Sequence, residues 1–362
     1  MRAEVITLHS VANYGTQLQA LATQEKLKEY FDDVSFIDYR RPDTYGVQLM
    51  RTFSKGSWVR GAVILPTMFL WRIIFGRFQK KYLKLTSQKY LSTDDLEHFR
   101  DDADYYVVGS DQVWNTGWNG GIIPAFYLSF IPSDKPKFSF SSSFGMSELP
   151  ATEVTEVSEY LEKFDSLSVR EPSAVKIVQN QLNIGNVTQL VDPVLSMPAS
   201  FWRSKATGKA PSKKFILIYS LNRNSKLDAY AEELSKRTGL LLIRFCTRLD
   251  QIFKTGHSKV IPNILDFITL IDNAEYVLTD SFHATAFSML LNTPPICIYP
   301  DQYSNRISEF LKLVNEETRH VTSYHDFSIL DKKINFDIVN ELLEVERRKV
   351  DNYLTAATNK NA

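Results

Sequence analysis

The chain has 362 residues, which is long for one globular core, so we expect two domains. Hydrophobic residues make up 44% and charged residues 23%, as in a water-soluble protein. The 42 Lys and Arg residues balance the 42 Asp and Glu residues, so composition does not predict nucleic-acid binding, which needs a net basic face. Cys246 and Cys297 lie in apolar runs, which indicates buried free thiols in a reducing compartment.

The first half of the chain alternates short apolar strands with helices. We expect strands at 4–8, 34–39, 105–109, 138–145, 166–171 and 187–192, and helices at 14–30, at 152–164 and after Pro172. The N-terminal apolar run is short and continues into helix-forming sequence, so we predict a first strand, no signal peptide and a cytoplasmic protein. Such alternation is typical of a parallel sheet covered on both faces.

Residues 58–85 form a predicted amphipathic insertion in this first domain. The charge-free run 61–71 is shorter than the roughly 20 apolar residues of a membrane span, and Pro66 interrupts it. Apolar bulk beside a basic cluster is typical of an interfacial helix. That cluster contains Arg77, Lys80, Lys81 and Lys84. Two alternatives stay open: a helix packed on the domain, or one that contacts an anionic membrane, in which case the protein acts at the inner face of the cytoplasmic membrane.

Residues 198–214 are polar and basic, contain Pro and lack a regular period, so we predict a linker. After it we expect strands at 215–221, 240–245, 275–280 and 296–299, and helices at 225–237, 264–273, 283–291, 304–314 and 336–355. The fold class is therefore α/β, with an N-terminal Rossmann-like domain at 1–197, a C-terminal one at 215–335, and a C-terminal helix and tail at 336–362. Ligands of such sheets bind at the carboxyl ends of the strands, so we expect both parallel sheets to face a central cleft.

Polar residues crowd the turn that follows strand 105–109. Gly109 permits close backbone approach, and Trp114 is an aromatic residue of the kind that stacks on a sugar. The alternative is an ordinary polar turn, because these residue types dominate turns. We predict an acceptor-binding edge whose polar members are Ser110, Asp111, Gln112 and Asn115.

The turn after the first strand has the same layout. Asn13 and Gly15 precede a helix, whose first turn would direct free amides and a positive dipole end into the cleft. Gln17 adds a polar group there. Simple capping by Asn13 is the alternative, because Asn is a preferred N-cap.

Arg170 ends a strand whose apolar residues we expect to be buried. A guanidinium at that position needs an anion or solvent, because an unpaired buried charge is costly. Glu171 or another acidic neighbour supplies that anion, or a carboxylate or phosphate ligand does. Spacing alone leaves both alternatives open.

His283 lies in the first turn of a helix that follows strand 275–280. A helix N-terminus binds phosphate readily, and an imidazole there donates to a phosphate oxygen or moves a proton. The alternative is a histidine that is hydrogen-bonded to Asp280 and has no further role. The six histidines are scattered without ligand spacing, so we predict no metal site. The absence of GxGxxG, P-loop and GxSxG motifs counts against NAD enzymes, NTPases and serine hydrolases.

The segments "NYGTQLQALA", "VVGSDQVWN", "SFSSSFG", "LSVRE", "LVDPVL" and "TDSFHATAFSMLLNTP" together resemble the polysaccharide pyruvyl transferase family. They occur in the family's order between about residues 5 and 315. The resemblance implies a fold similar to the glycosyltransferase-B enzymes. It also implies transfer of pyruvate from phosphoenolpyruvate to a sugar hydroxyl pair as a ketal, in the biosynthesis of capsule, exopolysaccharide or another cell-surface polysaccharide.

The resemblance also implies roles for residues. His283 is then the general acid or the phosphate ligand, and Asp111 contacts or deprotonates a lipid-linked or polymeric sugar acceptor. Arg170 binds the donor, phosphoenolpyruvate, which is a co-substrate, so no cofactor is expected. Well-known members carry an arginine two residues before this histidine, where this chain has Ser281. Candidates to replace that cation are Arg223, Arg244 and Arg306.

Two other functions compete with this one. A nucleotide-sugar glycosyltransferase of the same architecture would need a pocket for base and ribose, for which the sequence has no distinctive signal. A non-catalytic sugar-binding protein of an envelope gene cluster would tolerate replacement of His283 and Arg170.

Overall fold

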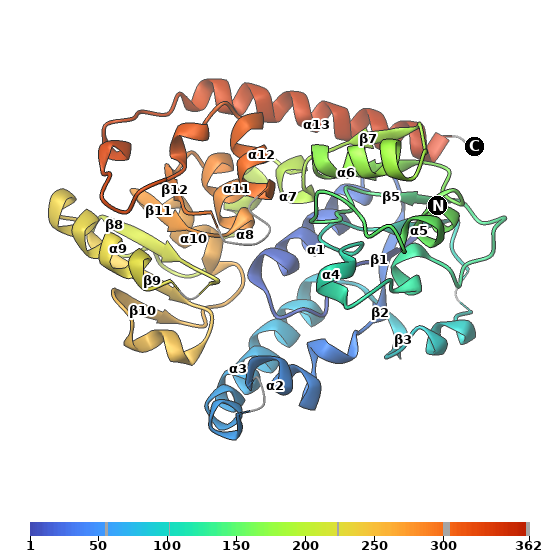
Figure 1. The fold of residues 1–362 in the computed structure, drawn as a ribbon, viewed down its shortest axis with the longest axis horizontal. Coiled ribbons are helices and arrows are strands. Elements are labelled where there is room, and N and C mark those ends of the chain that lie inside the picture. The colour runs from blue at the N-terminus through green and yellow to red at the C-terminus, as the bar shows by residue number, and fades with distance from the viewer. Residues whose placement is uncertain (55–56, 101, 223, 300–304, 360–362) are drawn as a thin grey trace. The chain divides into compact units, whose positions relative to one another are not determined.

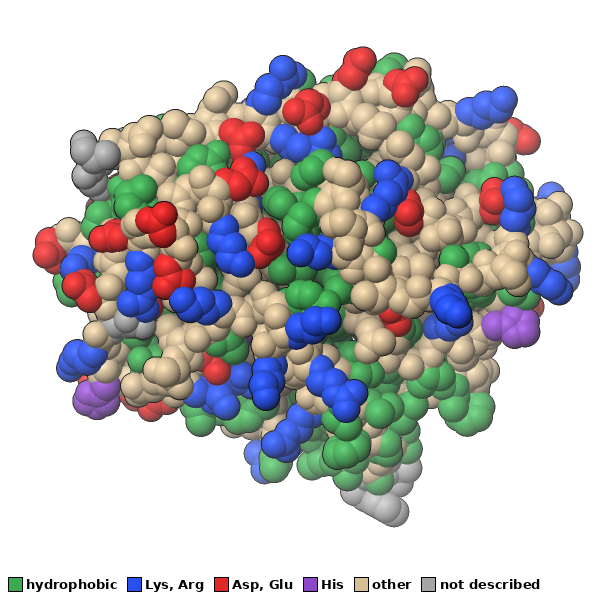
Figure 2. All heavy atoms as spheres, turned by 180° about the vertical axis from the view of Figure 1, so that it is seen from behind, with side chains coloured by type: hydrophobic (Ala, Val, Ile, Leu, Met, Phe, Trp, Pro, Cys, Tyr) green, Lys and Arg blue, Asp and Glu red, His purple; other side chains and the backbone are tan. Residues whose placement is uncertain are grey.

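The computed structural model describes the chain except residues 55–56, 101, 223, 300–304 and 360–362, and the side chains of 42 and 58–60 (Figure 1). The chain divides into two compact units. Unit 1 comprises residues 1–49, 79–197 and 345–362, and unit 2 comprises 50–78 and 198–344. Figure 2 shows acidic and basic side chains interspersed over the face it presents, in keeping with the balanced composition.

Unit 1 is built on a five-stranded sheet of order β3-β2-β1-β4-β5, in which neighbouring strands are parallel. Its strands are β1 (Arg2–Ile6), β2 (Asp33–Tyr39), β3 (Leu85–Tyr90), β4 (Tyr105–Val108) and β5 (Lys137–Ser139). A two-stranded parallel sheet adds β6 (Leu167–Val169) and β7 (Val187–Gln189). The unit's helices are α1 (Tyr14–Leu27), α4 (Thr116–Asn119), α5 (Val154–Leu161), α6 (Pro172–Lys176) and α7 (Pro193–Ser196).

The register of the central strands positions the polar turns of unit 1. Ile6 of β1 pairs with Val108 of β4, so the two parallel strands end at the same edge of the sheet. Residues 3–6 of β1 and all of β4 are buried, which is typical of a parallel sheet covered on both faces. The turns after β1 and β4 therefore emerge side by side.

Unit 2 repeats the same strand order, β10-β9-β8-β11-β12, again with parallel neighbours. Its strands are β8 (Phe215–Tyr219), β9 (Leu241–Cys246), β10 (His257–Val260), β11 (Tyr276–Thr279) and β12 (Pro295–Cys297). Its helices are α8 (Ala199–Lys205), α9 (Ser225–Thr238), α10 (Asp266–Asp272), α11 (Phe282–Leu290) and α12 (Asn305–Leu313). Three helices contain boundaries between the units: α2 (Gly46–Ser54), α3 (Trp58–Tyr82) and α13 (Phe336–Asn359). The predicted α/β class with two Rossmann-like parallel sheets is confirmed.

The predicted domain limits differ from these units at three segments. The predicted linker 198–214 contains α8 and belongs to unit 2, because the buried Trp202 packs edge-on against Phe287, with ring centroids 4.9 Å apart. The end of α13 belongs to unit 1, where the Tyr353 hydroxyl donates to the Ser139 carbonyl at 2.7 Å. Both assignments rest on contacts between residues far apart in sequence, which local patterns do not reveal.

The predicted insertion 58–85 is the third difference, since residues 50–78 belong to unit 2. The Trp71 indole donates to the Thr247 carbonyl at 2.8 Å, and the Leu249 amide donates to the Thr67 hydroxyl at 3.1 Å. These bonds hold α3 against the end of β9. Cys246 and Cys297 are buried free thiols as predicted, and burial raises the pKa of Cys297 to about 11.

Candidate functional site

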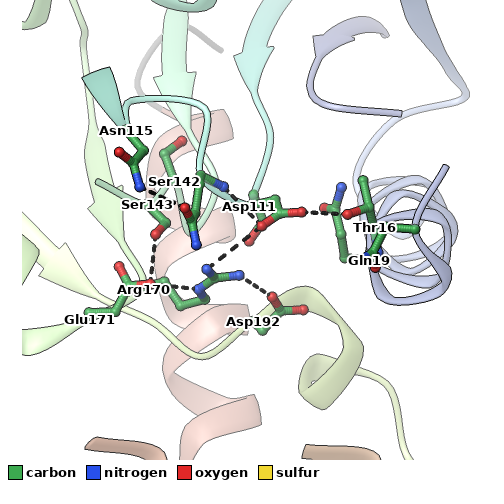
Figure 3. A network of polar contacts seen from close by, with 12 residues as sticks. Thr16, Gln19, Asp111, Asn115, Ser142, Ser143, Arg170, Glu171 and Asp192 are labelled. Atoms are coloured by element: carbon green, nitrogen blue, oxygen red, sulfur yellow. Dashed lines mark hydrogen bonds and ion pairs between the residues drawn. The ribbon is translucent and has the colours of Figure 1, made fainter. Parts of the chain in front are cut away.

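The carboxyl ends of β1, β4 and β5 carry a connected set of polar side chains with Asp111 at its centre (Figure 3). One Asp111 oxygen accepts from the Thr16 hydroxyl of α1 at 2.7 Å, and the other accepts from the Gln112 amide at 2.9 Å. Asp111 has a φ of 73°, a left-handed conformation that Asp tolerates better than most residues. Strained backbone of this kind is common at functional sites. The carboxylate is therefore held in one place by both neighbouring turns.

Arg170 lies beneath Asp111 and is enclosed by carboxyl groups (Figure 3). Its Nε donates to Glu171 at 2.9 Å and its Nη1 donates to Asp192 at 2.6 Å. Its Nη2 lies 3.9 Å from the Asp111 carboxylate. Burial lowers the pKa of Arg170, but attraction to the three carboxyl groups outweighs burial and raises the pKa above its ordinary value.

This geometry corresponds to the first of the two alternatives for Arg170, pairing with acidic neighbours. Three carboxyl groups around one guanidinium leave no excess of positive charge for an incoming phosphate or carboxylate. The predicted role of Arg170 in donor binding stays a prediction, and the observed pairing also suits a role in positioning Asp111.

Buried serines complete the support around this ion cluster. The Ser143 hydroxyl donates to Glu171 at 2.6 Å, and the Ser142 hydroxyl donates to the Gly109 carbonyl at 3.0 Å. The sequence pattern predicted only a strand at 138–145, and the contributions of Thr16, Ser143 and Asp192 were not predicted. The Asp-Pro pair at 192–193 was a usable signal, because Asp192 caps α7.

Trp114 does not form the predicted sugar-stacking edge. Its ring is fully buried, its indole donates to the Phe126 carbonyl at 2.9 Å, and it stacks on Tyr127 with ring centroids 5.7 Å apart. The loop turns Trp114 inward because its backbone amide donates to the Ser143 carbonyl. Trp118, four residues later, has an exposed ring, with the Arg41 guanidinium 4.3 Å from the ring centroid.

The other predicted residues of this loop shape its backbone. Asn115 caps α4 and donates to the Gln112 side chain at 2.6 Å. The Ser110 side chain is buried, and its carbonyl accepts from the Thr7 hydroxyl at 2.7 Å. Gly145 packs over the side chains of Asn115 and Gln112, and a Cβ there would lie 2.7 Å from the Asn115 amide nitrogen. The loop is thus a compact buried turn.

The turn after β1 is also held internally. Asn13 caps α1 by accepting from the Thr16 amide at 3.2 Å, which is the capping alternative. Gly15 is buried in the helix. The Gln17 side chain is fully buried and donates to the His9 carbonyl at 2.6 Å and the Val11 carbonyl at 2.9 Å. The Gln17 side chain therefore supports the turn after β1, and its predicted contact with the acceptor stays a prediction.

An open cavity of about 750 Å³ is lined by the start of α4, by residues between 146 and 154 and by Gln181. Its lining includes Thr116, Gly117, Met146, Leu149, Glu153 and Gln181. The Thr116 hydroxyl is buried without a hydrogen-bond partner among the described residues. A cavity of about 870 Å³ in unit 2 lies at the amino ends of β8 and β9, the edge of a parallel sheet where ligands do not usually bind.

In unit 2, the turn after β11 carries Asp280, Ser281 and His283. Asp280 accepts from the Leu221 amide at 2.7 Å and from the Ser220 hydroxyl at 3.0 Å, so its bonds fix the turn after β8. The predicted pairing of Asp280 with His283 stays a prediction. Ser281 is buried and caps α11 by accepting from the Ala284 amide at 3.4 Å.

His283 lies in the first turn of α11 and is largely buried. Its ring meets Phe282 edge-on at 5.2 Å, and the Arg306 guanidinium of α12 lies 5.9 Å from the same Phe282 ring. Arg306 is thus the candidate cation near the start of α11. Arg244 is buried against Asp228 and the Thr255 carbonyl, so it has a structural role, and Arg223 lies outside the described residues.

Solved structures similar to this chain are nucleotide-sugar enzymes. They include the UDP-GlcNAc 2-epimerase of Methanocaldococcus jannaschii with UDP-GlcNAc and UDP (TM-score 0.50, 13% identity, 98% of this chain and 100% of that chain). S. aureus MnaA with UDP gives a TM-score of 0.52 at 10% identity over 99% of this chain and 96% of that chain. The UDP-N-acetylglucosamine 2-epimerase of Rickettsia bellii gives 0.51 at 11% identity over 99% and 97%. At these identities the similarity shows the fold alone, which is glycosyltransferase-B-like.

Comparisons of the sequence identify the family. A search of curated protein sequences found no match. A family profile described as "Polysaccharide pyruvyl transferase" matches residues 13–302, which is most of the chain and includes the Asp111 loop, Arg170 and His283. The chain therefore belongs to the polysaccharide pyruvyl transferase family.

Proposed function

We propose that this transferase moves pyruvate from phosphoenolpyruvate to two hydroxyls of one sugar as a ketal, in the biosynthesis of a cell-surface polysaccharide. Family membership over residues 13–302 is the observation that carries the proposal. In the reaction, the methylene carbon of phosphoenolpyruvate takes a proton and becomes a methyl group. One sugar hydroxyl then bonds to the adjacent cationic carbon and loses its proton. The second hydroxyl displaces inorganic phosphate and loses its proton in turn.

The donor has two anionic groups, so it needs cations and oriented amides. The start of α11 supplies backbone amides and the positive end of a helix dipole, and His283 lies in that first turn. Arg306 adds a guanidinium near the same Phe282 ring. We assign the donor phosphate to this part of unit 2, with His283 as general acid or phosphate ligand.

The acceptor needs a group that orients or deprotonates its hydroxyls. Asp111 suits that role because hydrogen bonds from Thr16 and Gln112 fix its carboxylate while a small part of the side chain stays accessible. The cavity lined by Thr116 and Met146 offers room for a sugar next to the same loop. We assign the acceptor to this edge of unit 1, with Trp118 in place of Trp114 as the exposed aromatic side chain.

Donor choice is tested by thermal shift with phosphoenolpyruvate and, in parallel, a panel of nucleotide-sugars, because a ligand that binds only the folded state raises the melting temperature. We expect a shift with phosphoenolpyruvate alone. With a lipid-linked sugar acceptor, the protein should release phosphate and add a pyruvate-derived mass to the sugar. A shift and turnover that require a nucleotide-sugar would support a glycosyltransferase, and no response to any donor would support a non-catalytic sugar-binding protein.

The role of His283 is tested by His283→Ala, with His257→Ala as the matched control. His257 is exposed on β10, so its replacement should leave turnover unchanged. His283→Ala should lower turnover about 100-fold or more, as loss of a general acid or phosphate ligand does. Equal turnover per folded molecule in the two variants would contradict the assignment.

A further inference from the structure

Charge is distributed very unevenly along this balanced chain. The segment 44–93 contains no Asp or Glu. Its basic residues are Arg51, Lys55, Arg60, Arg72, Arg77, Lys80, Lys81, Lys84 and Lys89. The helices α2 and α3 lie within this segment, so they carry positive charge with no acidic side chain of their own to neutralise it.

One face of α3 is buried and the opposite face is exposed. The buried face, which includes Ile64, Trp71 and Phe75, packs the helix onto the protein. The exposed face begins with apolar side chains: Val63 is 56% exposed, Leu65 50% and Phe69 65%. Figure 2 shows hydrophobic side chains gathered at the end formed by α2 and the start of α3, with Lys and Arg side chains beside them.

The same exposed face becomes basic in its second half. Arg72, Arg77, Lys80 and Lys81 are all exposed. We define the α3 surface as the exposed residues Val63, Leu65, Phe69, Arg72, Arg77, Lys80 and Lys81. An apolar patch followed by cations on one helix face is the pattern of a helix that lies in a membrane interface.

A neighbouring segment exposes a further large apolar side chain. The turn after β9 is hydrogen-bonded to α3 through Thr247 and Leu249. Four residues beyond Leu249, Phe253 is 90% exposed, the highest value among the exposed large hydrophobic side chains of the described residues. Phe253 thus adds one exposed apolar side chain to the segment that follows the turn bound to α3.

Among the described helices, residues 61–82 of α3 are long and apolar enough to cross a membrane by length and composition. One third of the apolar window is buried, and Trp71 and Thr67 bind the turn after β9. A spanning helix would have to break both of these bonds and expose its buried face. The contacts therefore favour a helix that lies on a membrane over one that crosses it.

We propose that the α3 surface docks the protein on an anionic lipid bilayer. Its apolar half enters the boundary between headgroups and acyl chains, and its basic half contacts anionic headgroups. Charge complementarity favours this partner, because a neutral bilayer or an apolar protein groove would leave the basic half without opposite charge. The inference is independent of the donor and of the reaction, since it uses no residue assigned to either.

Vesicle co-sedimentation tests the charge requirement with the full chain. Binding should require phosphatidylglycerol in phosphatidylcholine vesicles and weaken as salt is added. The triple variant Arg77→Gln, Lys80→Gln, Lys81→Gln should bind on the order of 100-fold more weakly at low salt. The matched control, Lys213→Gln, Lys226→Gln, Lys236→Gln, removes the same charge from exposed positions of unit 2 that lie outside α3, and it should bind as the wild type does.

The apolar half is tested by a depth probe. Because both native cysteines are buried, a single Phe69→Cys substitution allows an environment-sensitive fluorophore to be attached selectively. Its emission should shift to the blue and rise in intensity with anionic vesicles, whereas the same probe on Ile338→Cys, an exposed position of α13, should not change.

Three results would overturn the proposal. They are equal loss of binding in both triple variants, a probe response that appears without vesicles and grows with protein concentration, and binding that salt does not reverse. The second result would indicate that a second copy of the chain covers the surface, and the third would indicate a helix that crosses the bilayer. Melting temperatures of all variants should match the wild type, because every substituted side chain is exposed.

Discussion

Replacing Arg170 by Met distinguishes two roles of this residue: a structural role in an ion cluster and a role as a donor-binding cation. Met has similar length and no charge, so the variant removes the guanidinium and leaves the carboxylates behind. Asp192 and Glu171 are both buried and would lose bonds of 2.6 Å and 2.9 Å. Breaking a buried ion pair by removing one partner costs about 3–5 kcal/mol, because the remaining charge is buried and uncompensated. We therefore expect Arg170→Met to lower the free energy of unfolding of unit 1 by about that amount.

The measurement is urea unfolding followed by tryptophan fluorescence at neutral pH. The control is Lys214→Met, which breaks the ion pair between Lys214 and Glu275. The Lys214 side chain is 76% exposed. Exposed pairs contribute about 0–1 kcal/mol, so the control should unfold almost as the wild type does. Adding Asp192→Asn to Arg170→Met should recover part of the loss, because it removes one of the unpaired charges.

If Arg170→Met unfolds within about 1 kcal/mol of the wild type while turnover with phosphoenolpyruvate disappears, the guanidinium contributes to the donor site and little to stability. A positioning role predicts a different result. Arg170→Met should then lose both stability and turnover, whereas Asp111→Asn should lose turnover and keep its stability.

Three further predictions follow from individual contacts. Gly145→Ala should lower the free energy of unfolding in urea by about 1–3 kcal/mol more than Gly120→Ala does. Both glycines have positive φ, but only Gly145 faces the side chains of Asn115 and Gln112. Equal losses of stability would contradict this packing. Trp118→Ala should raise KM for the acceptor and leave KM for the donor unchanged, whereas a change confined to the donor would remove Trp118 from the acceptor edge. Burial raises the pKa of Asp38, but hydrogen bonds from His9 and Arg40 outweigh it and hold that pKa at about 2, below its usual 3.8. This shift contributes about 2 kcal/mol to the free energy of unfolding above pH 4, and the contribution is lost as the pH falls toward 2. Asp38→Asn should therefore be less stable than the wild type at about pH 6 and match it near pH 2. A stability difference between the two proteins that does not change with pH would contradict this role of the Asp38 carboxylate.

Local patterns in the sequence determined most of the elements. Short buried apolar runs separated by capped helices predict parallel strands, because both faces of each strand are covered, and neighbouring strands are parallel in both five-stranded sheets. Capping of α1 by Asn13 could also be predicted, since the residue that caps a helix is adjacent to that helix in sequence. The edge strands β3 and β10 were missed because most of their residues are exposed or half-buried and carry no apolar pattern.

Tertiary structure decided what the polar residues do. Two tryptophans four residues apart have the same local chemistry, yet Trp114 is in the core and Trp118 is at the surface, because the Ser143 carbonyl draws the loop inward. The partners of Arg170 come from three separate turns, and Asp192 is 22 residues away. Sequence specifies an element through neighbours within a few residues, whereas burial and charge pairing are set by residues that only the folded chain brings together. For that reason the family and the parallel α/β class could be predicted, and the role of each buried polar side chain could not.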